Sequence, residues 1–326
     1  MNQRAKAVFY RQMSVMLTAG IPMNRAVDHL ASSGANPAAR QAAARISESV
    51  RKGEPFAHAV KQAFGARLTG FEQAAIVAGE TSGTLPECCR RLADYFDFVC
   101  LTRSRLISGM FYPGLLLHAG IVIPAVPSLI LRGCSSFVAQ ILPAFAFIYG
   151  AVAAVFVFRQ SAGLTRVREW WDVVVLDVPV LGGFVRAVDL SGFLYALSSL
   201  YGAGVPIVEA FRLAADAAGN TLIRRRLHAV VPALRQGVSL TSAVKDSGVV
   251  PQIVCDMFLT GEESGRLDET LERAASYLQQ EVETTTQRVV AVVPTIVYLL
   301  VAAYVAVVVI TFWSGYFGQI GSLLND

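Results

Sequence analysis

The strongest pattern along the chain is a set of three long apolar stretches separated by mixed sequence. They cover residues 110–131, 137–158 and 289–313. Each is long enough to cross the hydrocarbon core of a bilayer, which takes roughly 20 helical residues. The last stretch is rich in Val, Ile, Leu and Phe, each of which favours insertion by about 0.3–0.6 kcal/mol. We therefore expect three transmembrane helices, the first two forming a hairpin.

The basic residues near the ends of these stretches predict the orientation, because Lys and Arg concentrate on the cytoplasmic side. One side of the hairpin holds only Arg132, and the first residues lack the apolar core of a signal peptide. We expect residues 1–109 and 159–288 in the cytoplasm, with the turn at 132–136 and the tail 314–326 outside. The arginines on the cytoplasmic side are Arg90, Arg91, Arg103, Arg105, Arg159, Arg166, Arg168 and Arg288.

The two stretches outside the membrane repeat one another. Ala-Gly-Ile-Pro at 19–22 returns as Ala-Gly-Val-Pro at 203–206, and Gly-Glu-Thr-Ser-Gly-Thr-Leu at 79–85 returns as Gly-Glu-Glu-Ser-Gly-Arg-Leu at 261–267. An ordered series of matches of this kind indicates an internal duplication. The recurring residues that we take as candidate sites are Gly20, Pro22, Gly79, Glu80, Gly83 and Leu85, with Gly204, Pro206, Gly261, Glu262, Gly265 and Leu267.

Each copy shows helical periodicity and no alternating strand pattern. Apolar residues recur at helical spacing along 39–50 and again along 223–234, as on the buried face of an amphipathic helix. We expect Pro22 and Pro206 in the first turn of a helix, and Gly83 and Gly265 at helix C-termini with positive φ. Thr84 and Glu87 form a predicted capping box. The predicted fold is an all-α membrane protein with two homologous cytoplasmic helical bundles and three transmembrane helices.

Composition supports a membrane protein and argues against several function classes. Only 16% of residues are charged and 54% are apolar, whereas soluble domains carry about 25% charged residues. The net charge of +4 is spread along the chain, unlike the basic patch of a nucleic-acid binder. Phosphate-binding loops, zinc motifs and nucleophile elbows are absent from the sequence. We expect no enzyme activity, no cofactor and no metal.

Two groups of polar residues leave alternatives open. Glu80 and Glu262 precede helix C-termini, where a carboxylate opposes the macrodipole. They either form a salt bridge or cap that holds each bundle together, or make a contact surface for a partner or metal ion. His118 lies inside the first apolar stretch without an acidic or basic neighbour. It serves either packing and hydrogen bonding or, in the alternative, a proton relay.

These motifs carry a family resemblance. The Ala-Gly-[Ile/Val]-Pro turn, the stretches 52–56 and 236–240, and the Gly-Glu-x-Ser-Gly-x-Leu motif in both halves resemble the duplicated F domain. That domain belongs to the type II secretion F protein and the type IV pilus inner-membrane platform protein. The resemblance covers nearly the whole chain, including the order of domain, two spans, domain and span.

The resemblance implies an assembly platform in the bacterial inner membrane. Expected partners are a cytoplasmic secretion or pilus ATPase, pilin or pseudopilin subunits, other inner-membrane platform components, membrane lipid and further copies of the chain. Nucleotide would be bound by the ATPase alone, and nucleic acid is not an expected partner. The alternative class is an oligomeric transporter or channel component, but the spans lack the paired intramembrane charges typical of such a path.

Overall fold

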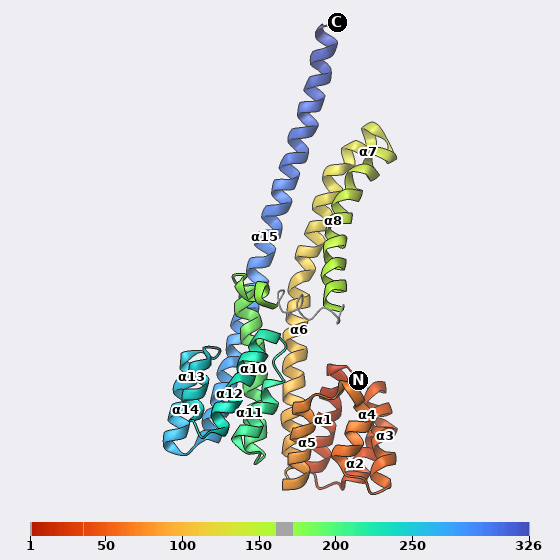
Figure 1. Cartoon of the computed structure of the whole chain (residues 1–326). Coiled ribbons are helices and arrows are strands. Elements are labelled where there is room, and N and C mark those ends of the chain that lie inside the picture. The colour runs from red at the N-terminus through yellow and green to blue at the C-terminus, as the bar shows by residue number, and fades with distance from the viewer. Residues whose placement is uncertain (1, 35, 161–171, 326) are drawn as a thin grey trace. The chain divides into compact units, whose positions relative to one another are not determined.

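The structure is a computed structural model that describes residues 2–34, 36–160 and 172–325, and within these residues helices joined by turns are the only regular secondary structure (Figure 1). The chain divides into two compact units. Unit 1 comprises Met1–Arg103 and Asp172–Thr285, and unit 2 comprises Ser104–Trp171 and Thr286–Asp326. The helices α6 (Leu85–Val122) and α15 (Leu267–Asn325) each contribute residues to both units. The start of the predicted linker, at 161–171, lies outside the described residues.

Unit 1 contains the two sequence repeats, and their helices follow one another in the same order. The first copy consists of α1 (Gln3–Thr18), α2 (Met23–Ser33), α3 (Pro37–Arg51), α4 (Phe56–Phe64), the 3₁₀ turn η1 (Gly65–Arg67), α5 (Gly70–Ser82) and the start of α6. The second consists of α10 (Leu181–Gly202), α11 (Ile207–Ala215), α12 (Thr221–Arg235), α13 (Leu240–Ser247), α14 (Gln252–Ser264) and the start of α15. The predicted duplication is therefore a duplication of structure.

The local signals in the sequence explain where these helices begin and which face they bury. Asn36 and Asn220 are equivalent N-caps, since each side-chain oxygen accepts from two backbone N–H groups of the helix that follows. The predicted stripes are buried except at Val50, which is half-buried: Ala43 in α3 and Leu227 in α12 are fully enclosed. Pro22 and Pro206 occupy the N-cap positions of α2 and α11, one residue before the predicted first turn.

One expected cap differs from the structure. The Glu87 carboxylate pairs with Arg90 and Arg91, and the Thr84 hydroxyl lies 2.7 Å from that of Ser82. The capping box of the first copy lies instead at the start of α5, between Thr69 and Glu72. Glu87 has arginines three and four residues ahead on its own helix, and charge-assisted bonds to them are stronger than a bond to a neutral N–H.

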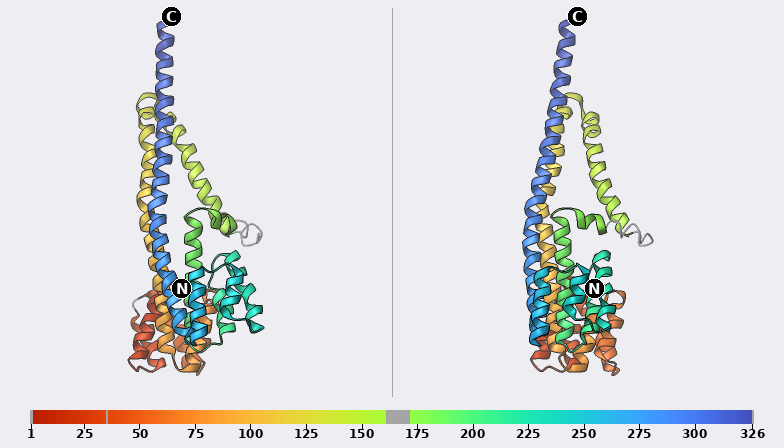
Figure 2. Two further views of the ribbon diagram at one scale, coloured as in Figure 1. Left: turned by 90° about the vertical axis from the view of Figure 1, so that its left-hand side faces the viewer. Right: turned by 60° about the vertical axis from the view of Figure 1, so that its left-hand side comes forward.

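Unit 2 holds the apolar stretches. The first predicted span, 110–131, is divided among the end of α6, the 3₁₀ turn η2 (Ile123–Ala125) and α7 (Val126–Arg132), with Pro124 in the turn. The chain then reverses into α8 (Cys134–Gln160), and Figures 1 and 2 show the resulting hairpin. Segments long and apolar enough to cross a membrane lie in α6 and α15. In the searched part of α8 the apolar helix is shorter, at Cys134–Gly150.

Within unit 2, glycines of α6 allow a close approach to α15. A Cβ atom built at Gly109 would lie 2.6 Å from Val290 Cγ1, and one built at Gly120 would also collide with a valine, Val301. Small residues let membrane helices approach closely, because packing drives their association in lipid. Gly114, on the same helix, has nothing within 4 Å of its Cβ position and faces open space.

Candidate interaction sites

Glu80 in the first copy binds the N-terminus of a neighbouring helix. Its two carboxylate oxygens accept from Phe56 N at 2.7 Å and from Ala57 N at 2.9 Å. These are the first N–H groups of α4, whose N-cap residue Pro55 has no side-chain bond of its own to offer. A negative charge at this end of a helix also complements the macrodipole. The Glu80 carboxylate, which is unfavourable at the C-terminus of its own helix α5, therefore serves as an N-terminal cap for α4.

Glu262 repeats this arrangement in the second copy. Its carboxylate accepts from Leu240 N at 2.6 Å, and from the N and Oγ1 atoms of Thr241 at 3.0 and 2.5 Å. Leu240 is the first residue of α13. Charge-assisted bonds of this type contribute about 1.5–3 kcal/mol each. The geometry is that of a structural cap in both copies, with Glu80 exposed and Glu262 half-buried.

The glycines of the same motif let its two helices meet closely. A Cβ atom at Gly79 would lie 2.7 Å from Cys88 Sγ, and one at Gly261 would overlap the hydroxyl of Thr270. Gly83 and Gly265 end α5 and α14 with φ of 75° and 68°, as predicted. The remaining candidate site residues have turn and packing positions. Gly20 and Gly204 have positive φ, Leu85 is buried and Leu267 is half-buried.

The two copies meet in unit 1 along a seam, which we define as the contact of α5 and α6 with α10 and α11. The Tyr195 hydroxyl donates to the Arg91 carbonyl at 2.5 Å, and the rings of Tyr95 and Tyr195 lie 5.5 Å apart. Phe71 packs edge-on against Tyr95 and is 1% exposed. Burial raises the pKa of Tyr95 to about 12.

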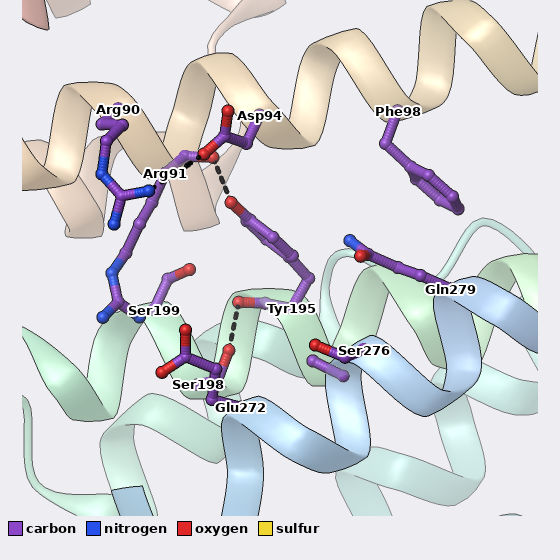
Figure 3. Close-up of a pocket in the computed structure, with 11 residues that line it drawn as sticks. Arg90, Arg91, Asp94, Phe98, Tyr195, Ser198, Ser199, Glu272, Ser276 and Gln279 are labelled. Atoms are coloured by element: carbon purple, nitrogen blue, oxygen red, sulfur yellow. Dashed lines mark hydrogen bonds and ion pairs between the residues drawn. The ribbon is translucent and has the colours of Figure 1, made fainter. Parts of the chain in front are cut away.

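A polar cavity of about 300 Å³ opens beside the seam (Figure 3). Three helices line it, and the Ser199 hydroxyl is buried there without a hydrogen-bond partner among the described residues. Three of the charged residues at its edge form ion pairs: Arg90 and Arg91 bind Glu87, and Asp94 binds Arg11 at 2.7 Å. The lining residues are Arg90, Arg91, Asp94, Phe98, Tyr195, Ser198, Ser199, Glu272, Ala275, Ser276 and Gln279.

Sequence reasoning missed the seam and its cavity. The lining residues come from α6, α10 and α15, which are far apart along the chain. The available signal was a difference between the repeats. Gly192 and Tyr195 in the second copy stand where Val8 and Arg11 stand in the first, and a glycine within a helix often marks a close approach.

His118 joins the two arms of the hairpin in unit 2. Its Nδ1 atom lies 2.7 Å from the Gly114 carbonyl, and its Nε2 atom lies 2.7 Å from the Tyr149 hydroxyl. A carbonyl only accepts, so Nδ1 donates to Gly114, and Nε2 and the tyrosine hydroxyl share a second hydrogen bond. The hydrogen-bonding interpretation of His118 is confirmed. Within the described residues, the structure shows no cluster of three His, Cys, Asp or Glu side chains suited to a metal ion.

Comparison with known proteins connects both copies to one family. The family model described as "Type II secretion system (T2SS), protein F" matches residues 9–131 and again 193–314. The chain belongs to this family. The two matched segments begin inside the equivalent helices α1 and α10 and run into the long apolar helices. The repeat found in the sequence is thus the duplicated family domain.

Relatives in this family are named as type IV pilus assembly proteins or as type II secretion system protein F. The chain is 26% identical to the type IV pilus assembly protein PilC of Pseudomonas aeruginosa, over 98% of this chain and 90% of that protein. It is 27% identical to the type II secretion system protein F of the same species, over 95% and 81%. The type IV pilus assembly protein TapC of Aeromonas hydrophila is 26% identical over 98% and 82%.

Proposed function

We propose that this chain is an inner-membrane assembly platform of a type II secretion or type IV pilus-like machine. The observation that carries the proposal is the family match to both copies, together with the apolar segments that follow each copy. The names of the relatives support both kinds of machine equally. The platform would couple a cytoplasmic ATPase to the assembly of pilin or pseudopilin subunits, without enzyme activity of its own.

In this proposal three helices span the membrane, at 110–131, 137–158 and 289–313. The domain 1–109 and the segment 159–288, with the linker and the second domain, lie in the cytoplasm, and 132–136 and 314–326 face outward. The arginine distribution supports this orientation. The bond between His118 and Tyr149 supports a paired hairpin, because it satisfies two polar side chains inside the apolar layer.

A native cysteine tests the orientation. Cys134 begins α8 and is exposed, whereas Cys88, Cys89 and Cys255 are buried. Intact cells treated with a membrane-impermeant thiol reagent should label the chain at Cys134, and Cys134→Ser should abolish the labelling. Labelling that persists in Cys134→Ser, or that requires broken cells, would contradict an outward-facing hairpin turn.

The function itself is tested by co-purification and loss of assembly. The chain, purified from membranes with a mild detergent, should retain the ATPase and pilin-like proteins made by the same organism. Deletion of its gene should stop filament assembly or secretion, and the intact gene should restore it. Normal assembly in the deletion strain would refute the platform role, and ion flux through liposomes of the purified chain would favour a channel.

We propose that Glu80 and Glu262 act by holding each bundle together. The caps on α4 and α13 support this role. Charge reversal of either residue should abolish assembly while membrane insertion is retained. Glu263, which is adjacent and exposed, provides the control: Glu263→Lys makes the same charge change and should leave assembly intact. Normal assembly by Glu80→Lys and Glu262→Lys chains would remove both residues from the functional set.

A further inference from the structure

The seam joins unlike faces of the two copies. The first copy contributes α5 and α6, whereas the second contributes α10 and α11, which are the equivalents of α1 and α2. Among the described residues, α14 has no comparable contact with α1 or α2. The contact is therefore heterologous, a head-to-tail type that closes into rings or continues as open filaments when it is repeated.

Each copy carries both faces, so one chain leaves one face of each kind unused. On the second copy, Ile253 in α14 takes the position of Phe71 in α5, and the exposed fraction rises from 1% to 44%. Arg273 and Tyr277 in α15 repeat Arg91 and Tyr95. On this face, formed by α14 and α15, the described residues leave Ile253 and Arg273 exposed, and Tyr277 is half-buried.

The first copy leaves the complementary face, on α1 and α2, uncovered. Val15 takes the position of Ser199, and the exposed fraction rises from 4% to 63%. Val8 and Thr18 stand where the seam has Gly192 and Gly202, whose Cβ positions contact α6. The larger side chains keep the helices further apart, so we expect a looser contact than the internal seam.

We propose that the α14–α15 face of one chain docks on the α1–α2 face of a second copy, in the manner of the internal seam. The exposed Ile253 and Val15 would be covered in this contact, and apolar burial is the driving force. Arg11 replaces Tyr195 and is held by Asp94 and Asp97 within its own copy. The tyrosine–carbonyl bond is therefore not repeated, which again makes the contact between chains weaker than the seam.

The seam specifies which residues should meet across two chains. In the seam, a Cβ atom at Gly202 would lie 3.4 Å from Arg91 Nη1. Thr18 is the first-copy equivalent of Gly202, and Arg273 is the second-copy equivalent of Arg91. Thr18 of one chain should therefore meet Arg273 of the other. Both of these residues are exposed within the chain. Arg235, an exposed arginine at the end of α12, lies on neither face and serves as a matched control position.

Disulfide crosslinking in membranes tests the proposal. Two differently tagged full-length chains are co-expressed, one with Thr18→Cys and the other with Arg273→Cys, both in a background with Cys100→Ala and Cys134→Ala. Mild oxidation should join the two tags, and a chain that carries both substitutions should give products larger than a dimer. Thr18→Cys with Arg235→Cys should remain at least tenfold less crosslinked.

Three results would overturn the proposal. The first is that Thr18→Cys chains crosslink only to one another, and the second is that Thr18→Cys crosslinks as well to Arg235→Cys as to Arg273→Cys. The third result is that oxidation yields only monomers. The inference does not rest on the proposed function, since the experiment needs neither an ATPase nor a filament. A failed secretion assay would therefore leave it standing, and failed crosslinking would leave the platform role standing.

Discussion

A buried ion pair in the first copy gives the sharpest prediction about stability. Lys6 Nζ and Glu72 Oε2 lie 2.5 Å apart, with side-chain exposures of 5% and 0%. Glu72 also accepts from the Tyr10 hydroxyl at 2.8 Å and from Thr69 N at 3.1 Å. Lys6 lies 5.1 Å from the centre of the Phe96 ring. Burial and the Glu72 carboxylate raise the pKa of Tyr10 well above its usual range.

The second copy builds the same place from apolar residues. The positions equivalent to Lys6, Tyr10 and Glu72 hold Leu190, Leu194 and Val254, all buried. Lys6→Leu alone leaves the buried Glu72 carboxylate without its cationic partner and should cost about 3–5 kcal/mol. Lys6→Leu with Tyr10→Leu and Glu72→Val copies the second domain and should be neutral or more stable by about 1–4 kcal/mol. The single variant is thus expected to be the less stable of the two.

Thermal unfolding of the detergent-purified chain, followed by circular dichroism, measures this difference. Unit 1 comprises residues 1–103 and 172–285, and a domain of this size loses roughly 2–4 °C of Tm per kcal/mol, so the single variant should lower its Tm by about 6–20 °C. Hydrogen exchange of the α1 and α5 amides should localise the loss. Equal destabilisation by the single and triple variants, or a loss of less than about 1 kcal/mol for Lys6→Leu, would refute the reasoning.

Three further predictions concern other sites. Gly120→Leu should overpack the α6–α15 contact and cost about 1–3 kcal/mol. Gly114→Leu faces open space, so it should leave the Tm of the detergent-purified chain unchanged. Equal effects of the two substitutions would contradict the close approach. Glu262→Gln keeps acceptor oxygen but loses charge, so it should cost less than Glu262→Lys in a melt, with Glu263→Lys near wild type. Tyr95 stabilises the fold below its unfolded pKa, and this contribution is lost as pH rises from about 10 toward about 12. Alkaline melts of Tyr95→Phe should therefore show a smaller loss, and an unchanged pH profile would contradict this.

Much of the secondary structure could be predicted because its signals are local. Asn36 and Asn220 cap the helices that follow them, and Gly83 and Gly265 end helices with positive φ. The buried stripes follow from the spacing of apolar residues on one helix face. The burial of Lys6 had only a weak signal in the sequence, which is that the equivalent residue of the second copy is the apolar Leu190.

The partners of polar groups could not be predicted in the same way. Glu80 binds Phe56 N from 24 residues further along the chain. The sequence around either residue does not indicate that the two will form a hydrogen bond. The capping box at Thr84 failed because Glu87 had stronger local partners in two arginines. A motif search considers each short segment alone. In the folded chain, each of these side chains can bind any group that tertiary packing brings within hydrogen-bond distance.

The sequence by itself determined the duplication, the helical nature of each copy and the apolar stretches, because periodicity and composition act within one segment of chain. Only the tertiary structure decided that Glu80 and Glu262 cap neighbouring helices, that one copy encloses a lysine where the other encloses a leucine, and that α5 meets α10. These contacts form between distant segments, and their free energy depends on what else is buried beside them.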